Sequence, residues 1–148
     1  MSRPIRLATR ALILIENRLL LVNAFASGVS DLWCAPGGGA EPHAALPDNL
    51  AREVHEETGL TVDVGPPVLV NEFHDPCRDF HQVDLYFRCT PLNDMPESWV
   101  DPEGIVTERR LFSRVELDAI RYKPDSLPEV AWEDGDATTY DALEPLVR

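Results

Sequence analysis

The sequence contains the run Gly37-Gly38-Gly39-Ala40-Glu41, then a loop, then Arg52-Glu53-Val54-His55-Glu56-Glu57-Thr58-Gly59-Leu60. A run of glycines is typical of a turn and leaves backbone amides and carbonyls accessible. Pro47 suits an early helix position and Gly59 suits a helix end, so the pattern predicts a helix over residues 47–58. A glycine-rich segment is therefore followed by a helix rich in carboxylates.

Three of these carboxylates, Glu53, Glu56 and Glu57, share one face of the predicted helix. At about 100° per residue they lie within an arc of about 100°. Their repulsion destabilises the helix unless positive charge lies among them. Oxygen-only ligands of this kind suit a hard cation such as Mg²⁺ or Mn²⁺, which can also contact substrate phosphates. A solvated acidic helix face is the alternative explanation.

The segment resembles the Nudix box, the signature of the Nudix hydrolase family. That pattern is Gly, five residues, Glu, seven residues, then Arg-Glu-apolar-x-Glu-Glu-x-Gly-apolar. Residues 38–60 match eight of its nine specified positions, and the exception is Ala44, where the family has Glu. Glu41 and Asp48 are nearby carboxylates that could compensate for Ala44, although neither occupies the family position. The matching residues are Gly38, Arg52, Glu53, Val54, Glu56, Glu57, Gly59 and Leu60.

The resemblance implies an α+β fold, a Nudix-type α/β/α sandwich with a mixed β-sheet. The length of 148 residues fits a single Nudix hydrolase domain over residues 1–148 with one hydrophobic core. Hydrophobic and turn patterns predict the elements in more detail. Strands are expected at residues 5–15, 19–22, 32–35, 60–64, 68–73, 82–89 and 105–112, and helices at 47–58, 113–120 and 139–147.

The resemblance also implies metal-dependent hydrolysis of a nucleoside diphosphate linked to a further group. The cation, Mg²⁺ or alternatively Mn²⁺, would be held by Glu53, Glu56 and Glu57 together with the carbonyl of Gly37 or Gly38. These glutamates are the main catalytic candidates.

Arg52 joins the catalytic candidates in a structural role, because it can pair with a neighbouring glutamate. Members of the family often use one more carboxylate from a later loop, and Glu97, Glu103 and Glu108 are the candidates. We favour Glu103, because Pro102-Glu103-Gly104 predicts a turn just before a strand.

Six residues outside the helix are candidates for contact with the substrate. Arginines can bind phosphate, an aromatic ring can stack on a base, and backbone groups of the glycine segment can cradle a pyrophosphate. Phe73 and Tyr86 are further aromatic candidates for stacking, although aromatic residues in strands are more often core residues. The substrate-binding candidates are Arg6, Arg10, Arg78, Trp33 and the pair Gly38 and Gly39.

The resemblance favours a (deoxy)nucleoside triphosphate as substrate, giving nucleoside monophosphate and pyrophosphate. ADP-ribose or another nucleotide sugar is the alternative, to which the position of Pro76 is a weak pointer. The departure at Ala44 leaves a third reading open, a non-catalytic nucleotide-binding regulatory protein.

Composition excludes other classes. The formal net charge of −13 argues against duplex nucleic acid as a partner, because such proteins need a basic surface. Three cysteines without CxxC spacing predict free thiols, and the apolar run at residues 11–15 is too short for a signal peptide or membrane span. We therefore expect a cytoplasmic protein with a small-molecule nucleotide as partner and no membrane contact, and we keep a homodimer as an open expectation.

Overall fold

The computed structural model describes residues 1–25, 28–133, 135 and 137–148. The strands are β1 (Arg6–Ile15), β2 (Arg18–Asn23), β3 (Leu32–Trp33), β4 (Gly37–Gly39), β5 (Val62–Asp75), β6 (Phe80–Pro91), β7 (Glu108–Phe112), β8 (Arg121–Tyr122), β9 (Thr139–Tyr140) and β10 (Glu144–Pro145). The α-helices are α1 (Leu46–Thr58) and α2 (Leu127–Trp132), and the 3₁₀ helices are η1 (Pro76–Arg78) and η2 (Val115–Ala119). Within these ranges no helix is both long and apolar enough to cross a membrane.

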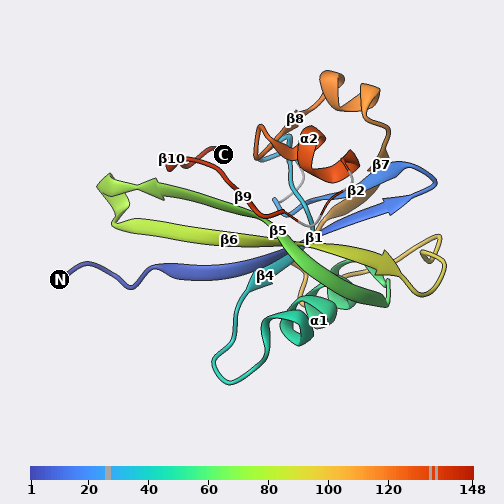
Figure 1. Ribbon diagram of the computed structural model, residues 1–148, viewed down its shortest axis with the longest axis horizontal. Coiled ribbons are helices and arrows are strands. Elements are labelled where there is room, and N and C mark those ends of the chain that lie inside the picture. Colours follow the sequence, from blue (N-terminus) through green and yellow to red (C-terminus); the bar gives the residue numbers. More distant parts are fainter. Residues whose placement is uncertain (26–27, 134, 136) are drawn as a thin grey trace.

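A mixed sheet forms the centre of the molecule, in the order β10-β5-β6-β1-β2-β7, with β4 also on β1 and β9 also on β5. Strand β1 runs parallel to β6 and antiparallel to β2 and β4. Figure 1 shows α1 below the sheet and α2 above it. The predicted α+β fold, an α/β/α sandwich on a mixed sheet, is therefore confirmed.

The sheet divides the hydrophobic core into two layers, where the sequence suggested one. Along β1, Ala11 and Ile13 face α1, whereas Leu12 faces α2, as the alternation of side chains in a strand requires. On the α1 side, Leu50 and Val54 of the helix are fully buried against the sheet. These two residues fix the rotation of α1 and so decide which of its faces carries the glutamates.

Several predicted elements agree with the structure. The polar break after β1 is a tight hairpin turn in which Glu16 and Asn17 have φ of 50° and 62°. The helix predicted at residues 47–58 begins one residue earlier. All three cysteines are free thiols.

Strand β5 is one element where the sequence predicted two. Its pairing with β6 shifts register on both sides of Pro67, which bends the strand without ending it. The strand predicted to begin at residue 105 begins instead at Glu108, because the backbone of the preceding segment is engaged in a local turn.

The predicted C-terminal helix over residues 139–147 is wrong. That segment forms β9 and β10, which lie parallel along the outer edge of β5. The amide of Asp141 donates to Val70 O at 2.9 Å, and the amide of Leu146 donates to His74 O at 2.9 Å. The backbone N–H and C=O groups on the outer edge of the long strand β5 would otherwise be unpaired, which favours the addition of a further strand there. Pro145 also disfavours a helix at this position.

The predicted helix over residues 113–120 is a shorter 3₁₀ helix, η2, and the sequence did not predict α2. The capping box predicted at the start of this segment, before η2, is nevertheless present. The amide of Ser113 donates to Glu116 Oε1 at 2.9 Å, and the amide of Glu116 donates to Ser113 Oγ at 3.2 Å.

Docking of α1 on the sheet is testable through Leu50, which is fully buried. Because Leu50→Ala leaves a cavity, we expect it to lower the free energy of unfolding by about 2–5 kcal/mol. Leu92→Ala is the control, since Leu92 is 63% exposed and an exposed truncation should change stability by less than about 0.5 kcal/mol. Urea unfolding measures both, and equal losses would contradict the packing described.

Candidate active site

Helix α1 presents its glutamates to the glycine strand β4. Pro47 lies in its first turn, and Gly59 ends it in a left-handed conformation with φ of 80°, its amide donating to His55 O at 2.9 Å. The buried stripe of Leu50 and Val54 holds one face of the helix on the sheet. The neighbouring face, with the glutamates, therefore lies beside the glycines.

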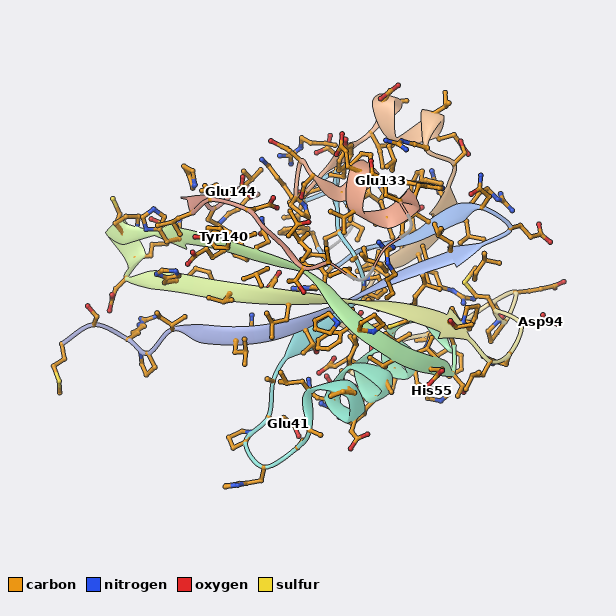
Figure 2. All side chains as sticks on the ribbon, in the orientation of Figure 1. Glu41, His55, Asp94, Glu133, Tyr140 and Glu144 are labelled. Atoms are coloured by element: carbon orange, nitrogen blue, oxygen red, sulfur yellow. The ribbon has the colours of Figure 1, made fainter. Side chains whose placement is uncertain are left out.

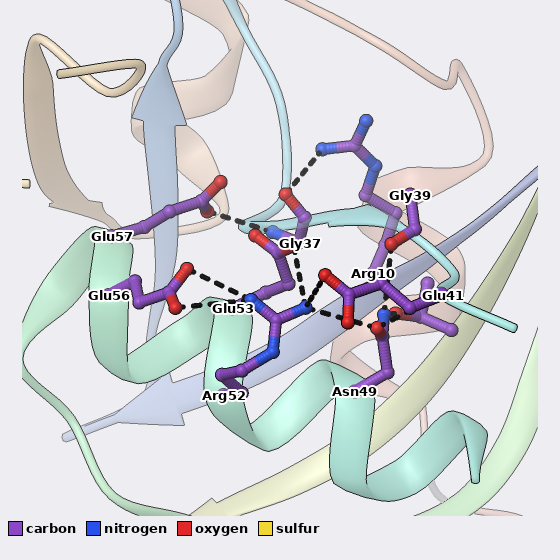
Figure 3. A network of polar contacts seen from close by, with 10 residues as sticks. Arg10, Gly37, Gly39, Glu41, Asn49, Arg52, Glu53, Glu56 and Glu57 are labelled. Atoms are coloured by element: carbon purple, nitrogen blue, oxygen red, sulfur yellow. Dashed lines mark hydrogen bonds and ion pairs between the residues drawn. The ribbon is translucent and has the colours of Figure 1, made fainter. Parts of the chain in front are cut away.

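Arg52 lies at the centre of a polar network that joins α1 to the loop before it (Figure 3). Its Nη1 lies 3.1 Å from Glu56 Oε1, and its Nη2 lies 3.2 Å from Glu53 Oε1 and 3.3 Å from Glu41 Oε1. Nη2 also donates to Asn49 Oδ1 at 3.1 Å. One guanidinium thus offsets the repulsion among three carboxylates, as the structural role predicted for Arg52 requires.

Glu57 is the most deeply buried of the three helix glutamates, with 6% of its surface exposed. Its Oε2 accepts a hydrogen bond of 2.9 Å from the amide of Gly37. Burial raises the pKa of Glu57 to about 8, although the Gly37 amide and the positive charge of Arg10 both oppose this shift. The ionised form of Glu57 therefore lacks sufficient positive charge around it.

Glu53 packs directly against Gly38. A Cβ atom on Gly38 would lie 2.7 Å from the carboxyl carbon of Glu53, so only glycine fits at this position while the carboxylate stays in place. Burial raises the pKa of Glu53, Arg52 opposes the shift, and the negative charges of Glu56 and Glu103 add to it. The glycine strand and the glutamate face are thus complementary in shape and short of positive charge.

The donor set fits a hard divalent cation. Carboxylate and carbonyl oxygens are the ligands that Mg²⁺ and Mn²⁺ prefer, and Gly38 leaves room for Glu53 that a side chain would fill. Across the described ranges no three His, Cys, Asp or Glu side chains converge as a ready metal centre, because Arg52 and the Gly37 amide engage the carboxylates. A cation would have to replace some of these contacts.

Two predicted substrate arginines lie on β1 beside the glycine strand. Arg10 Nε lies 3.3 Å from Asp84 Oδ2, and its Nη1 donates to Ala35 O at 3.3 Å and Gly37 O at 3.5 Å. Arg6 donates to Gln82 Oε1 at 2.5 Å, and its guanidinium also lies next to Gly39. Both arginines are therefore near the candidate site, but each has partners within the protein.

Arg78 and Trp33 do not lie with the glutamates. Arg78 is in η1 at the tip of the β5–β6 hairpin, away from α1, where its Nε lies 3.6 Å from Asp75 Oδ2 (Figure 1). Trp33 is 6% exposed and packs edge-to-face on Phe112 with ring centroids 5.1 Å apart. The structure gives Trp33 a place in the core, as most aromatic residues in strands have.

The candidates for the additional carboxylate differ in their surroundings. Glu108 is the first residue of β7, and its Oε1 accepts from Arg110 at 2.6 Å on the exposed surface. Glu97 is exposed in the loop after β6. Glu103 lies in the predicted turn, close enough to Glu53 for its charge to act on that carboxyl group.

Sequence reasoning missed Asn49, which is 2% exposed. Its Nδ2 donates to Gly39 O at 3.2 Å and to Thr9 Oγ1 at 3.3 Å, and its Oδ1 accepts from the Glu41 amide at 3.3 Å. Asn49 thereby ties α1 to β1, β4 and the intervening loop. Asn49 lies one helical turn before Arg52 and Glu53, so helix spacing could have placed it on the same face as these residues.

A cavity of about 210 Å³ is lined in part by Arg10. Phe25, Phe73 and Leu146 contribute apolar wall, and the C-terminal segment closes one side. Figure 2 shows Tyr140 and Glu144 of that segment on the opposite side of the sheet from Glu41. Arg10 lines this cavity and also contacts Gly37 O, so one side chain connects the cavity to the glycine strand. The polar side chains that line it include Arg10, Asn71, Asp84, Tyr86, Lys123 and Glu144.

Comparison with known proteins places this geometry in a family. A family model described as NUDIX domain matches residues 4–132. Diphosphoinositol polyphosphate phosphohydrolase 2 of Rattus norvegicus is 35% identical over 106 residues, which cover 72% of this chain and 54% of that protein. Nucleoside diphosphate-linked moiety X motif 6 of Homo sapiens is 29% identical over 82 residues, covering 55% of this chain and 23% of that protein. The chain thus spans about half or less of these relatives.

Solved structures show the same fold. A UDP-X diphosphatase superposes with a TM-score of 0.69 at 19% identity, covering 95% of this chain and 69% of that chain. An ADP-ribose pyrophosphatase from Streptococcus suis 89-1591 superposes with a TM-score of 0.67 at 22% identity, covering 93% of this chain and all, 100%, of that chain. Because the family model spans most of its length and the glycine strand and glutamate helix coincide with the box, the chain belongs to the Nudix hydrolase family.

Proposed function

We propose that this protein is a Nudix pyrophosphohydrolase that uses Mg²⁺, or alternatively Mn²⁺, to convert a (deoxy)nucleoside triphosphate and water into nucleoside monophosphate and pyrophosphate. The observation that carries the proposal is the position of Arg10. It contacts the glycine strand, whose Gly37 amide bonds Glu57, and also lines the cavity, so the proposed metal site and the cavity are connected through one residue.

Glu53, Glu56 and Glu57, with a carbonyl of the glycine segment, would hold the cation. A bound divalent cation supplies charge that offsets the diphosphate and activates water for attack on phosphorus. Arg52 keeps Glu53 and Glu56 in position through its ion pairs. The Gly37 amide orients Glu57. The protein thereby holds the three carboxylates on one helix face next to the glycine strand, and a bound cation would replace some of their contacts with Arg52 and the Gly37 amide.

The lining of the cavity suits a nucleoside better than an inositol ring that carries several phosphates. Its walls include Phe73 and Leu146, and its charged groups are paired, Arg10 with Asp84 and Lys123 with Glu144. An uncharged heterocycle suits such a lining, whereas several additional phosphates would meet apolar surface and cations that already have acidic partners. The organisation as a single domain over residues 1–148, a homodimer and a cytoplasmic location stay predictions.

The deciding experiment is a substrate panel with Mg²⁺ and product identification. Release of nucleoside monophosphate and pyrophosphate from a triphosphate supports the proposal. Cleavage of ADP-ribose or another nucleotide sugar would replace the substrate assignment, and binding without turnover would identify a non-catalytic nucleotide-binding protein.

Glu57→Gln tests the site assignment. It removes one negative charge with little change in shape, and we expect kcat to fall by at least about 100-fold while the fold persists. Steady-state kinetics at saturating Mg²⁺, with circular dichroism as the control for folding, measure the effect. Undiminished kcat in a folded variant would remove Glu57 from the site.

The same variant tests the charge deficit at Glu57. The folded-state pKa of about 8 exceeds the ordinary value of 4.5, so the contribution of this carboxyl group to stability is present below pH 4.5 and is lost as pH rises to 8. Without metal, Glu57→Gln should therefore become more stable relative to the wild type between pH 5 and 8. Urea unfolding in chelator at several pH values measures this difference, and a difference independent of pH would contradict the buried environment.

Ala44→Glu tests whether the departure from the box only weakens metal binding. Added negative charge near the cation should lower the Mg²⁺ concentration for half-maximal rate. Ala44 lies in the exposed loop before α1, so Glu should be tolerated there. Rate is measured against Mg²⁺ at fixed substrate and then against substrate at saturating Mg²⁺. An unchanged Mg²⁺ requirement with a raised KM would show that the loop serves a different substrate pose.

A further inference from the structure

The segment between β6 and β7, residues 92–107, is docked on the C-terminal end of α1. Figure 2 shows Asp94 of this segment at the same end of the molecule as His55. The indole Nε1 of Trp99 donates to Glu56 O at 2.8 Å, and its ring meets His55 edge-on with centroids 5.4 Å apart. A Cβ atom on Gly59 would lie 2.8 Å from the Trp99 ring, so the glycine that ends α1 also makes room for the docked segment.

Arg109 of β7 strengthens this docking from the other side. Its Nη1 donates to Thr58 O at 2.5 Å, and its Nη2 donates to Pro96 O. The guanidinium thus contacts a terminal carbonyl of α1, where the helix dipole favours positive charge, and the beginning of the docked segment. Segment and helix end are joined through one side chain.

Asp101 organises the part of the segment that follows. It is 6% exposed, and its Oδ1 accepts from the Glu103 amide at 2.9 Å. Its Oδ2 accepts from the amides of Ile105 at 3.1 Å and Val106 at 2.9 Å. Its own carbonyl accepts from the Gly104 amide at 2.9 Å. Residues 101–106 form a closed turn, which we call the Asp101 turn.

The Asp101 turn, which contains Glu103, begins two residues after Trp99, the residue that donates to the backbone of Glu56 on α1. Glu103 is exposed, and its charge acts on Glu53, while the charge of Asp101 acts on Glu57. Asp101 and Glu103 therefore lie within electrostatic reach of two of the helix residues proposed to hold the cation. Because the turn fixes the backbone at Glu103, less of the chain has to become ordered when substrate arrives than on a free loop.

We infer that Asp101 is a positioning residue, which acts on the reaction by holding Glu103 at the glutamate face of α1, with Trp99 as the contact that docks the segment on the helix. The inference rests on the proposed function. Asp101 itself has its carboxylate filled by three backbone amides, so it acts through the turn and Glu103 is the carboxylate left to face the substrate.

A double-mutant cycle with Glu103 tests this inference. Asp101→Asn replaces one carboxylate oxygen by an NH₂ group, which cannot satisfy all three amides. We expect kcat to fall by about tenfold, with KM changed by less than about twofold, because an interaction of the transition state is lost. In the Glu103→Gln background, Asp101→Asn should have no further effect. Asp94→Asn, an equivalent change at an exposed position of the same segment, should leave activity unchanged.

Hydrogen exchange of the metal-free protein gives a readout that does not depend on activity. Asp101→Asn should increase exchange at residues 103–106 and leave α1 protected, whereas Asp94→Asn should change neither. Trp99→Phe is a second variant, which removes the indole donor and should also lower kcat only while Glu103 is present.

The outcomes separate the two proposals. Turnover by the wild type with additive effects of Asp101→Asn and Glu103→Gln overturns the inference alone. A normal rate for Glu103→Gln together with a slow Asp101→Asn also overturns it. Absence of turnover in the wild type with every substrate overturns the proposed function and this inference together.

Discussion

The carboxylate face of α1 packs against the glycine strand β4, and this contact limits which residues both elements can carry. Gly38 leaves no room for a side chain because the Glu53 carboxyl group fills that space, and the amide of Gly37 is committed to Glu57. Partly buried carboxylates so close together disfavour folding unless positive charge is supplied. Arg52 supplies part of it, and what remains is the electrostatic condition for binding a cation.

Strand β1 of the sheet connects the glycine strand to the cavity on the opposite face. Strand β1 pairs with β4 on one side and with β6 on the other, and it carries Arg10 between Gly37 and Asp84. The cavity and the glutamates lie on different sides of this strand pairing and share one guanidinium. A change that moved Arg10 would therefore disturb both the glycine strand and the cavity.

Local patterns predicted the parts of the fold that local chemistry determines. The helix over residues 47–58 follows from Pro47, Gly59 and its apolar stripe, and the glutamate face follows from helical spacing. Residues 139–147 were mispredicted as a helix because their strand pairing depends on a free edge of β5, distant in the chain. Arg78 shows the same limit, since alternation and composition do not reveal which end of the sheet a hairpin tip will occupy.

Charge balance around Arg52 explains how the site is compatible with Ala44. Glu41 Oε1 lies 3.3 Å from Arg52, so the loop before α1 still contributes one carboxylate to the network although the box position lacks it. Asp48, the other compensating candidate, is exposed and is not among the carboxylates paired with Arg52 in the described part of the chain. Glu41 is itself largely exposed, and an exposed pair contributes little to stability. Its carboxylate can therefore leave Arg52 at small cost, whereas Glu53 packs against Gly38 and Glu57 accepts from the Gly37 amide. The loop contact is thus replaceable and the helix contacts are fixed, so a departure from the box in the loop leaves the arrangement of the helix glutamates unchanged.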